Sequence, residues 1–449
     1  MRRFLLITAV VTTSLLLSIV AHAQTVALVA DRLIDGVSDR AINDAAVVIE
    51  GEDIVAVGGR DVIPAGAQVI ELGDMTLMPG MINAHEHPQL YADDYQNAHL
   101  QASSAYKTLR SLAALQSWLL AGWTTVRVMG DGDVYYGNMD LKRAIAEGLF
   151  TAPRLTGAAH YISTTGGGGD MHFISPEQGV TPDGLIVDGP QAMIKAVRRE
   201  VMYGSDWIKL MVTGAFHAVG GDPKNLAMSP EELAAAMAEA GRQGVPVAAH
   251  AHATAGINAA IRAGARSIEH GTYLDDESIE LMVEHGTFYV PTIYVGDYYA
   301  GSDKLLAQAK NDDPYLQYRD EWLRLIGQAH RAGVKVVVGL DLGSTPVPDT
   351  GVFAREFAVL VEAGLSEMDA IRAGTRVAAE MLDWDDRLGT LEAGKLADII
   401  AVPGNPLKDI SALERVGFVM IGGQIVRRPG ETPSLSGALS KPDGGSPHE

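Results

Sequence analysis

One stretch of the chain reads Met78-Pro79-Gly80-Met81-Ile82-Asn83-Ala84-His85-Glu86-His87, an apolar run that ends in two histidines separated by one residue. In an extended strand, successive side chains alternate between faces, so His85 and His87 point the same way. Two imidazoles on one face at a strand end can bind one metal ion. A polar loop after a buried strand explains the motif equally well, so the rest of the chain decides between the two interpretations.

Downstream of this stretch, strand-like and helix-like runs alternate, which is typical of βα repeats. Eight strands are expected near residues 78–84, 122–129, 153–160, 206–212, 246–250, 266–270, 287–294 and 334–341. Helices are expected at residues 101–121, 137–148, 189–203, 229–243, 254–264, 274–285, 304–332, 351–364, 366–374 and 375–382. The pattern predicts an α/β fold with a (β/α)8 TIM barrel over residues 80–382.

Short β-rich pieces separated by turn residues lie on both sides of the barrel. We expect residues 24–79 and 383–430 to form one small β-sandwich domain. The tail, residues 431–449, is rich in Pro, Gly and Ser and is expected to be disordered.

The first 23 residues have the pattern of a secretory signal peptide. Arg2 and Arg3 supply a positive start, an apolar run follows, and Ala21-His22-Ala23 offers a cleavage site. An uncleaved membrane anchor is the alternative, but the run is short for a span and contains Thr and Ser. We therefore expect a periplasmic or secreted protein with no membrane attachment after removal of residues 1–23.

The composition of the chain excludes several classes of function and of site. The chain has 449 residues, of which 47% are hydrophobic and 20% charged, as in globular proteins. Its formal net charge of −21 argues against binding to nucleic acid or anionic lipid. There are no cysteines, so disulfides, thiolate metal sites and cysteine nucleophiles are excluded. Any metal must be held by His, Asp, Glu or a modified side chain.

Side chains that can take part in a metal site recur at the ends of the predicted barrel strands, where the active sites of such barrels lie. Beyond the first two histidines, these residues are Lys209, His250, His252, His270 and Asp341. Each alone has an ordinary explanation, such as a satisfied polar residue, a buried ion-pair lysine or a helix cap. Their joint occurrence at one mouth favours a metal site.

These strand ends, the P-G-M-I-N-A-H-E-H motif of residues 79–87 and the closing segment 388–399 resemble the amidohydrolase superfamily in its binuclear-metal form. The resemblance covers residues 24–427. Within the superfamily, the chain is most similar to the exported ochratoxinase-like group, which includes Xaa-Pro and Xaa-Arg dipeptidases. The motifs that carry this similarity are Trp207-Ile208-Lys209, His250-Ala251-His252, Ser267-Ile268-Glu269-His270-Gly271 and Gly339-Leu340-Asp341.

The resemblance implies six ligands for two divalent ions, expected to be zinc: His85, His87 and Asp341 for the first, His250 and His270 for the second, and Lys209 between them. Lys209 would be carboxylated by CO2. An ammonium cannot ligate a cation, whereas a carbamate offers two anionic oxygens to bridge the ions.

The implied reaction is hydrolysis of the amide between an acyl group and a C-terminal amino acid by a metal-activated hydroxide. Such substrates include ochratoxin A, which yields ochratoxin α and phenylalanine, and dipeptides. Asp341 would take the hydroxide proton and deliver it to the leaving nitrogen. His252, His217 or the second metal would stabilise the oxyanion, although His252 could instead support a ligand. The resemblance also implies a homo-oligomer.

Residues that contact the substrate are less constrained by the sequence. Arg154, Lys224 and Arg355 are candidates for binding a substrate carboxylate, and His160, Tyr161 and Tyr294 for lining the pocket. Members of the group often carry a histidine in the loop after the third strand. Here that loop reads Thr164-Thr165-Gly166-Gly167-Gly168-Gly169-Asp170, with His172 beyond it, so its substrate contacts are in question.

Two alternatives stay open. One keeps the metals and changes the substrate to a cyclic amide or lactam, as in imidazolonepropionase, or to exported peptides cleaved by a carboxypeptidase-like dipeptidase. The other is a non-catalytic barrel that serves as a scaffold, which could dispense with several of the six ligands.

Overall fold

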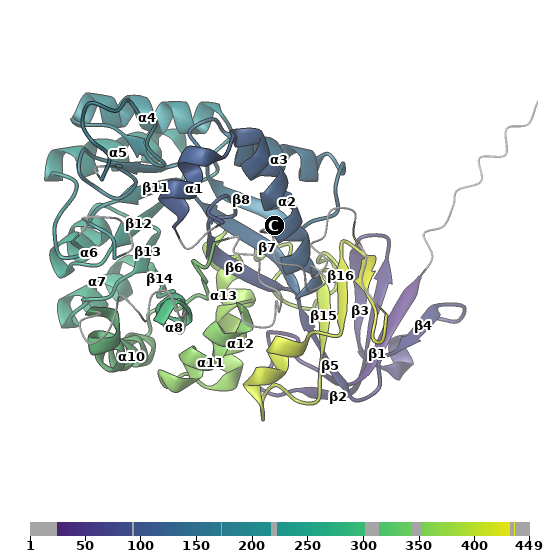
Figure 1. Ribbon diagram of the computed structural model, residues 1–449. Coiled ribbons are helices and arrows are strands. Elements are labelled where there is room, and N and C mark those ends of the chain that lie inside the picture. The colour runs from purple at the N-terminus through teal and green to yellow at the C-terminus, as the bar shows by residue number, and fades with distance from the viewer. Residues whose placement is uncertain are drawn as a thin grey trace, which may run out of the picture.

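The computed structural model describes residues 25–91, 94–171, 173–216, 222–300, 314–343, 353–431 and 435. The predicted signal peptide, residues 1–23, and nearly all of the predicted disordered tail, residues 431–449, lie outside these ranges. Figure 1 shows a helix-covered barrel beside a smaller sheet that contains both the purple amino-terminal and the yellow carboxy-terminal strands.

The barrel is built from parallel strands in two hydrogen-bonded sheets. One sheet has the order β6-β7-β8 and the other β10-β9-β11-β12-β13-β14. The strands are β6 (Met81–Glu86), β7 (Trp123–Met129), β8 (Arg154–Ala158), β9 (Tyr161–Ser163), β10 (Leu185–Ile186), β11 (Ile208–Met211), β12 (Val247–Ala251), β13 (Ser267–His270) and β14 (Phe288–Val290).

Hydrogen bonds join the two sheets at both edges. On one side, the backbone N–H groups of Asp206 and Trp207 donate to Gly157 O. On the other, the segment 334–341 lies between β14 and β6, where Val337 N donates to Tyr289 O at 2.8 Å and Ala84 N to Val338 O at 3.0 Å. The ring that results is of the TIM-barrel type.

Two of the predicted strands differ from expectation. The third, residues 153–160, is interrupted and continues as β9, which pairs with β11. The eighth, residues 334–341, is not a regular strand and makes one isolated bridge, between Tyr289 and Val336.

Helices follow the barrel strands as predicted, with bounds that differ by a few residues. They are α2 (Ser104–Leu120), α3 (Gly137–Ala146), α4 (Pro190–Met202), α5 (Pro230–Gln243), α6 (Thr254–Arg262), α7 (Asp276–His285), α10 (Pro314–Ala332), α11 (Arg355–Glu362), α12 (Glu367–Ala373) and α13 (Arg376–Met381). Two short helices were not predicted, α1 (Tyr95–Gln101) and α8 (Tyr294–Ala300). Part of the expected helix 304–332 lies outside the described residues, so only α10 tests it.

Local chemistry explains where these helices begin and end, and α5 is a clear case. Ser229 and Glu232 form a capping box, Pro230 occupies the first turn, and Gly244 ends the helix in the left-handed conformation. Leu233, Ala236, Met237 and Ala240 form its buried face, at the spacing of an amphipathic helix.

The smaller part is one sheet of eight strands in the order β17-β16-β15-β5-β1-β2-β3, with β4 also paired to β1. Its strands are β1 (Val26–Leu33), β2 (Ile42–Glu50), β3 (Asp53–Gly59), β4 (Gln68–Glu71), β5 (Met75–Pro79), β15 (Ile399–Pro403), β16 (Phe418–Ile421) and β17 (Gln424–Arg427). The amino- and carboxy-terminal segments therefore share one sheet, and its division into the two layers of a sandwich stays a prediction.

The stretch of residues 78–87 crosses from the sheet into the barrel. Met78 pairs with Ile400 in the sheet, and the chain enters β6 after Gly80. A Cβ at Gly80 would lie 2.2 Å from Thr124 Oγ1, so glycine permits this close crossing. The same region is tied by Arg154, which donates two hydrogen bonds to Asp398 at 2.8 and 3.0 Å. The sheet thus anchors the start of the strand that ends in His85 and His87.

Among the described residues, we find no helix with the length and apolar character that a membrane crossing requires.

Candidate metal centre

The structure brings the six predicted ligands together at the carboxyl ends of the barrel strands. Around His85, its Nε2 lies 3.3 Å from His87 Nε2 and 3.4 Å from Lys209 Nζ. Asp341 Oδ1 lies 3.3 Å from His87 Nε2 and 3.7 Å from His85 Nε2. Five of the six side chains are buried, and Asp341 is 21% exposed.

The second half of the cluster consists of imidazoles from β12 and β13. The ring centroids of His250 and His270 are 4.6 Å apart, and the ring of His85 lies 5.0 Å from that of His270. The ring of His252 stacks on that of His270 at 4.9 Å with an interplanar angle of 15°. Lys209 lies on β11, the strand next to β12, so its amine reaches toward the first half.

Two overlapping groups of donor atoms lie close enough to hold a cation. The possible ligand atoms of His85, His270 and Asp341 lie within 4.8 Å of one another, and so do those of His250, His252 and His270. Imidazole nitrogens and carboxylate oxygens are ligands that zinc accepts. The residues present therefore fit a divalent metal centre.

In each of the four predicted histidine ligands, one ring nitrogen has a protein partner outside the cluster. These contacts join His85 Nδ1 to Glu269 Oε2 at 2.6 Å, His87 Nδ1 to Gly130 O at 2.5 Å, His250 Nε2 to Gly214 O at 3.0 Å and His270 Nδ1 to Thr292 Oγ1 at 2.7 Å. Such partners fix the tautomer and orientation of a metal-binding imidazole. The other nitrogen of each ring is left for a metal.

Sequence reasoning missed the buried ion pair behind His85. Arg127 and Glu269 are fully buried and their side chains meet at 2.8 Å. The signal was available, because a charged residue of each sign interrupts an apolar strand, in Val126-Arg127-Val128 and in Ile268-Glu269-His270. Such residues need partners when buried.

Burial keeps most of the histidines neutral, which metal binding requires. It lowers the pKa of His85 to about 4 and that of His250 to about 3, and it lowers the pKa of His270 well below its usual value. Burial also lowers the pKa of His87, but the hydrogen bond and charge of Asp341 outweigh it and raise the pKa overall.

The pKa values of Lys209 and Asp341 are shifted in the directions that their predicted roles need. Burial lowers the pKa of Lys209 to about 8, so a substantial fraction of its amine is neutral near physiological pH. For Asp341, burial raises the pKa, but the nearby His85 and His87 outweigh it and hold the pKa well below the usual range. Its side chain is therefore a carboxylate that can accept a proton or bind a cation.

The backbone is strained around the cluster. His270, Thr292 and Asp341 adopt positive φ angles of 69°, 50° and 57°. Side chains other than glycine rarely occupy this left-handed region, and such strain is concentrated at functional sites. At Asp341, the hydrogen bond from its N–H to His85 O, at 2.9 Å, fixes this conformation.

The predicted catalytic histidines have different outcomes. His252 belongs to the cluster, since its ring lies 4.6 Å from that of His250 and 4.9 Å from that of His270. Its Nδ1 lies 2.8 Å from Thr272 Oγ1, and Phe216 packs edge-on against its ring at 4.7 Å. His217 lies outside the described residues, as does His172 of the glycine-rich loop.

The three candidates for binding a substrate carboxylate make different contacts. Arg154 is paired with Asp398 at the junction with the small sheet, at the amino end of β8 and away from the ligands. Arg355 faces Glu414 at 3.5 Å. Lys224 is exposed and lies 5.0 Å from the ring of Tyr273. Tyr273 in turn lies 6.3 Å from Phe216, the ring beside His252, so Lys224 is the candidate linked to the cluster.

The three candidates for lining a substrate pocket also make different contacts. The ring of Tyr161 lies 6.0 Å from that of His87, edge to face. His160 Nδ1 lies 2.9 Å from Glu200 Oε1, an internal contact. The backbone N–H of Tyr294 donates to Glu356. Tyr161 is therefore the one of the three in contact with a predicted ligand.

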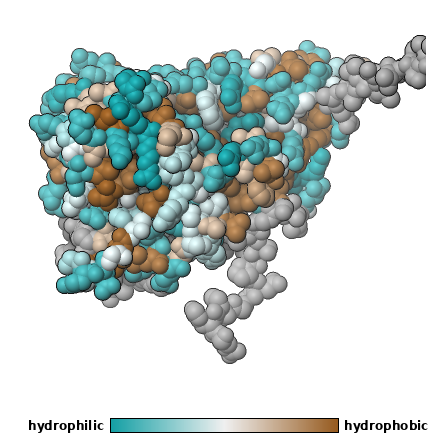
Figure 2. Space-filling view, turned by 90° about the horizontal axis from the view of Figure 1, so that it is seen from above, coloured by the Kyte–Doolittle hydropathy of each residue, from teal (hydrophilic) through white to brown (hydrophobic). Residues whose placement is uncertain are grey.

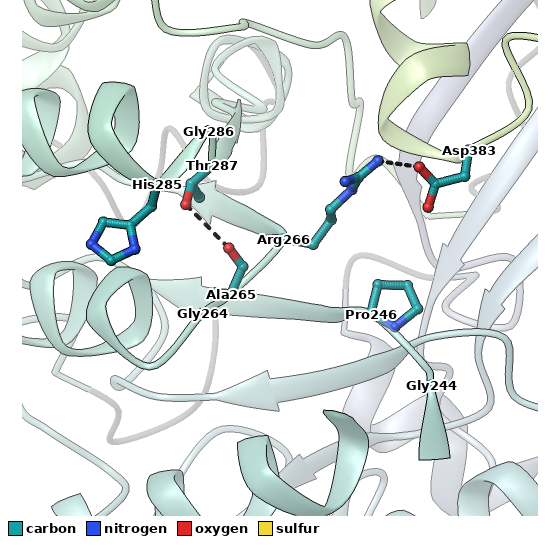
Figure 3. A pocket seen from close by; sticks show the side chains of 9 residues that line it. All are labelled: Gly244, Pro246, Gly264, Ala265, Arg266, His285, Gly286, Thr287 and Asp383. Atoms are coloured by element: carbon teal, nitrogen blue, oxygen red, sulfur yellow. Dashed lines mark hydrogen bonds and ion pairs between the residues drawn. The ribbon is translucent and has the colours of Figure 1, made fainter. Parts of the chain in front are cut away.

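A cavity of about 400 Å³ lies at the other end of the strands, lined by residues that precede β12, β13 and β14. Figure 3 shows Arg266 reaching to Asp383 and Thr287 to the backbone of Ala265 at its walls. The guanidinium of Arg266 also donates to the carbonyl groups of Glu380 and Met381. These contacts hold the barrel base together, and the predicted ligands lie at the opposite end.

The fold and this cluster define a hydrolase of the TIM-barrel type, and comparison with known proteins agrees. Residues 76–426 match the Amidohydrolase family, so the chain belongs to it. The chain is 30% identical to ochratoxinase of Aspergillus niger over 442 residues, which span 92% of this chain and 88% of the relative.

Two solved structures are similar over nearly their full length. A Xaa-Pro dipeptidase with methionine bound in its active site superposes with a TM-score of 0.80 and 33% identity, over 90% of this chain and 100% of that one. The crystal structure of A. niger ochratoxinase gives a TM-score of 0.79 and 30% identity, over 92% and 98% of the two chains. The chain is an amide hydrolase that fits the ochratoxinase-like group of the family.

Proposed function

We propose that this protein hydrolyses the amide bond between an acyl group and a C-terminal amino acid, with two divalent metal ions, expected to be zinc. The observation that carries the proposal is the convergence of four imidazoles, one buried amine and one carboxylate at one end of the barrel. The resemblance to an ochratoxinase and to a Xaa-Pro dipeptidase supports the choice of bond.

The ligands would divide between two positions. His85, His87 and Asp341 would hold one ion, and His250 and His270 the other. Lys209, as its carbamate, would bridge them, and its lowered pKa favours the neutral amine that reacts with CO2. When bound, the ions would lower the pKa of a shared water and polarise the amide carbonyl.

The chain's own groups would move the protons. Asp341, an ionised carboxylate beside His87, would accept a proton from the attacking water and pass it to the leaving nitrogen. His252, buried and held by Thr272, would donate a hydrogen bond to the oxyanion from its other ring nitrogen. Proton transfer by a positioned side chain contributes about 10²–10⁴-fold in rate.

The experiment is an assay of ochratoxin A, of a library of Xaa-Pro and other dipeptides, and of cyclic imides and lactams, with and without a chelator. We expect cleavage of acyl–amino acid amides that stops on chelation and returns with zinc. Cleavage of cyclic amides alone would favour the imidazolonepropionase-like alternative. A protein that binds no metal and cleaves nothing would be a scaffold.

Export and assembly are part of the proposal but rest on other features. Residues 1–23 predict cleavage of a signal peptide and a periplasmic or secreted product, which amino-terminal sequencing of the mature protein would test.

Figure 2 shows apolar areas scattered among hydrophilic residues on one face, and exposed apolar side chains include Leu109, Tyr135, Leu149 and Met202. A homo-oligomer stays a prediction, to be measured by light scattering.

A further inference from the structure

Each of the four predicted histidine ligands is backed by a protein partner, meaning a group that contacts the ring nitrogen facing away from the cluster. These partners differ in charge. A carbonyl group backs His87 and another backs His250, while the Thr292 hydroxyl backs His270. His85 alone among the four is backed by a carboxylate, that of Glu269. A hydrogen bond from a metal-binding imidazole to a carboxylate raises the basicity of the ring more than one to a neutral oxygen.

Both oxygens of Glu269 have a fixed role. Oε1 accepts hydrogen bonds from Arg127 at 2.8 Å and from Ser267 Oγ at 2.5 Å. Oε2 faces His85 Nδ1 at 2.6 Å. A carboxylate can only accept, so this geometry places the proton of His85 on Nδ1 and leaves Nε2 bare, toward Lys209 and His87.

Arg127, the ion-pair partner of Glu269, is also fixed by further contacts. Its Nε donates to Ala84 O at 2.5 Å, one residue before His85, and its guanidinium lies 4.5 Å from the ring of Trp207. Arg127, Glu269 and His85 are all fully buried. The arrangement is therefore a rigid, water-excluded chain from Arg127 through Glu269 to the ligand.

We propose that Arg127 and Glu269 are a positioning pair that makes the His85, His87 and Asp341 position the tighter of the two metal positions. The inference rests on the proposed binuclear function. The first position combines a carboxylate ligand with an imidazole backed by a second carboxylate. The second position has His250 and His270, whose hydrogen-bond partners are neutral, and shares only Lys209 with the first. The Asp341 carboxylate lies 3.9 Å from His270 Nδ1, beyond hydrogen-bond distance.

The decisive variant is Glu269→Gln, which keeps the shape of the side chain. Arg127 and Ser267 both donate to one oxygen, so the amide oxygen of Gln stays there and its NH2 group faces His85 Nδ1. That NH2 favours the tautomer with the proton on Nε2, which cannot bind a metal. We expect the tighter zinc dissociation constant to weaken about 10–100-fold, the range for loss of such an outer partner.

Two matched variants separate this role from general packing. Ser267→Ala removes one donor to Glu269 but leaves the carboxylate and Arg127, so both zinc constants should stay within about twofold of wild type. Thr292→Val removes the partner of His270 and should weaken only the looser constant. Thermal unfolding confirms that each variant is folded, and ¹⁵N NMR of the histidine rings in the metal-free protein reports the tautomer of His85.

Zinc is titrated into metal-free protein in competition with a chelating indicator. The expected wild-type result is two zinc ions per chain with distinct constants, of which Glu269→Gln weakens the tighter one. If the wild type binds two ions and folded Glu269→Gln leaves the tighter constant unchanged, or weakens both equally, this inference is wrong and the proposed function stands. If the wild type binds no zinc, the proposed function fails and the inference fails with it.

Discussion

The carboxylate of Asp341 lies 3.3 Å from Nε2 of His87, and the backbone N–H of Asp341 donates to the carbonyl of His85 at 2.9 Å. The side chain and the backbone of Asp341 are thus both fixed to the segment at the end of β6, although the two segments are far apart in the sequence. The carboxylate is held where it can serve as a ligand and exchange a proton with a neighbour.

Asp341→Asn should abolish proton transfer with little effect on the fold, because Asn tolerates the left-handed backbone that Asp341 adopts. We expect kcat for an acyl–amino acid to fall about 10²–10⁴-fold while most of the zinc stays bound. Steady-state kinetics and elemental analysis of the same preparation measure the two effects. Asp140→Asn, at an exposed site on α3, is the control, and wild-type rates in Asp341→Asn would exclude the proton-transfer role.

Zinc uptake should depend on CO2 and on pH through Lys209. The pKa of its amine is lowered to about 8, and only the neutral amine forms a carbamate, so the reactive fraction grows roughly eightfold from pH 7 to pH 8.5. Dissolved CO2 must be held constant, since it falls with pH at fixed bicarbonate. The rate of zinc uptake by metal-free protein is the measurement.

Lys209→Met supplies the control for this experiment, because a thioether forms no carbamate. We expect at most one zinc ion per chain in the variant. A remaining pH dependence in Lys209→Met would come from His87, whose pKa is raised, or from the buried carboxyl groups of Glu86 and Asp131, whose pKa values burial raises to about 8 and about 7. Full loading of wild-type protein in the strict absence of CO2 would rule out a carbamate bridge.

His252→Gln should separate catalysis from metal binding. The ring of His252 stacks on His270 and is held by Thr272, but the proposed ligands of the second ion are His250 and His270. We expect two zinc ions to remain and kcat to fall about 10²-fold, as for an oxyanion donor. His285→Gln, on the exposed end of α7, is the control. Loss of one zinc ion in His252→Gln would instead make His252 a ligand.

Arg154→Met should lower the free energy of unfolding. Arg154 makes two hydrogen bonds to Asp398, whose side chain is 3% exposed. Among the described residues, Asp398 would then keep the N–H of Gly422 as its hydrogen-bond partner. Leaving a buried charge without its partner costs about 3 kcal/mol. Denaturant unfolding of Arg154→Met beside Arg143→Met tests this, since Arg143 is 72% exposed and its removal should change nothing measurable.

The sequence was sufficient for most helices and strands because their periodicity and caps are local. It also indicated the six candidate ligands, since five of them follow or end a visible apolar run and Lys209 interrupts one. The break after β8 and the irregular eighth segment were not predictable, because both depend on pairing with strands elsewhere in the sequence. Pairing across the barrel, such as that of Asp341 with His87, depends on closure of the whole ring.

The partners of the ligands were mostly hidden for the same reason. Gly130 and Gly214 act through backbone carbonyl groups, which carry no side-chain signal. Arg127 and Glu269 are the exception, because a charge inside an apolar strand indicates a buried partner of opposite sign. Which strand supplies that partner follows only from the order of strands in the barrel.

The left-handed backbone at His270, Thr292 and Asp341 carries a thermodynamic consequence. Each such residue costs the folded state about 1–3 kcal/mol, so the mouth of this barrel is less stable than a relaxed one would be. Glycine at His270 or Asp341 would relieve that strain and remove a proposed ligand in the same step. Selection for thermal stability alone should therefore favour substitutions at these two positions that inactivate the protein. Stabilising variants of this enzyme must keep His270 and Asp341.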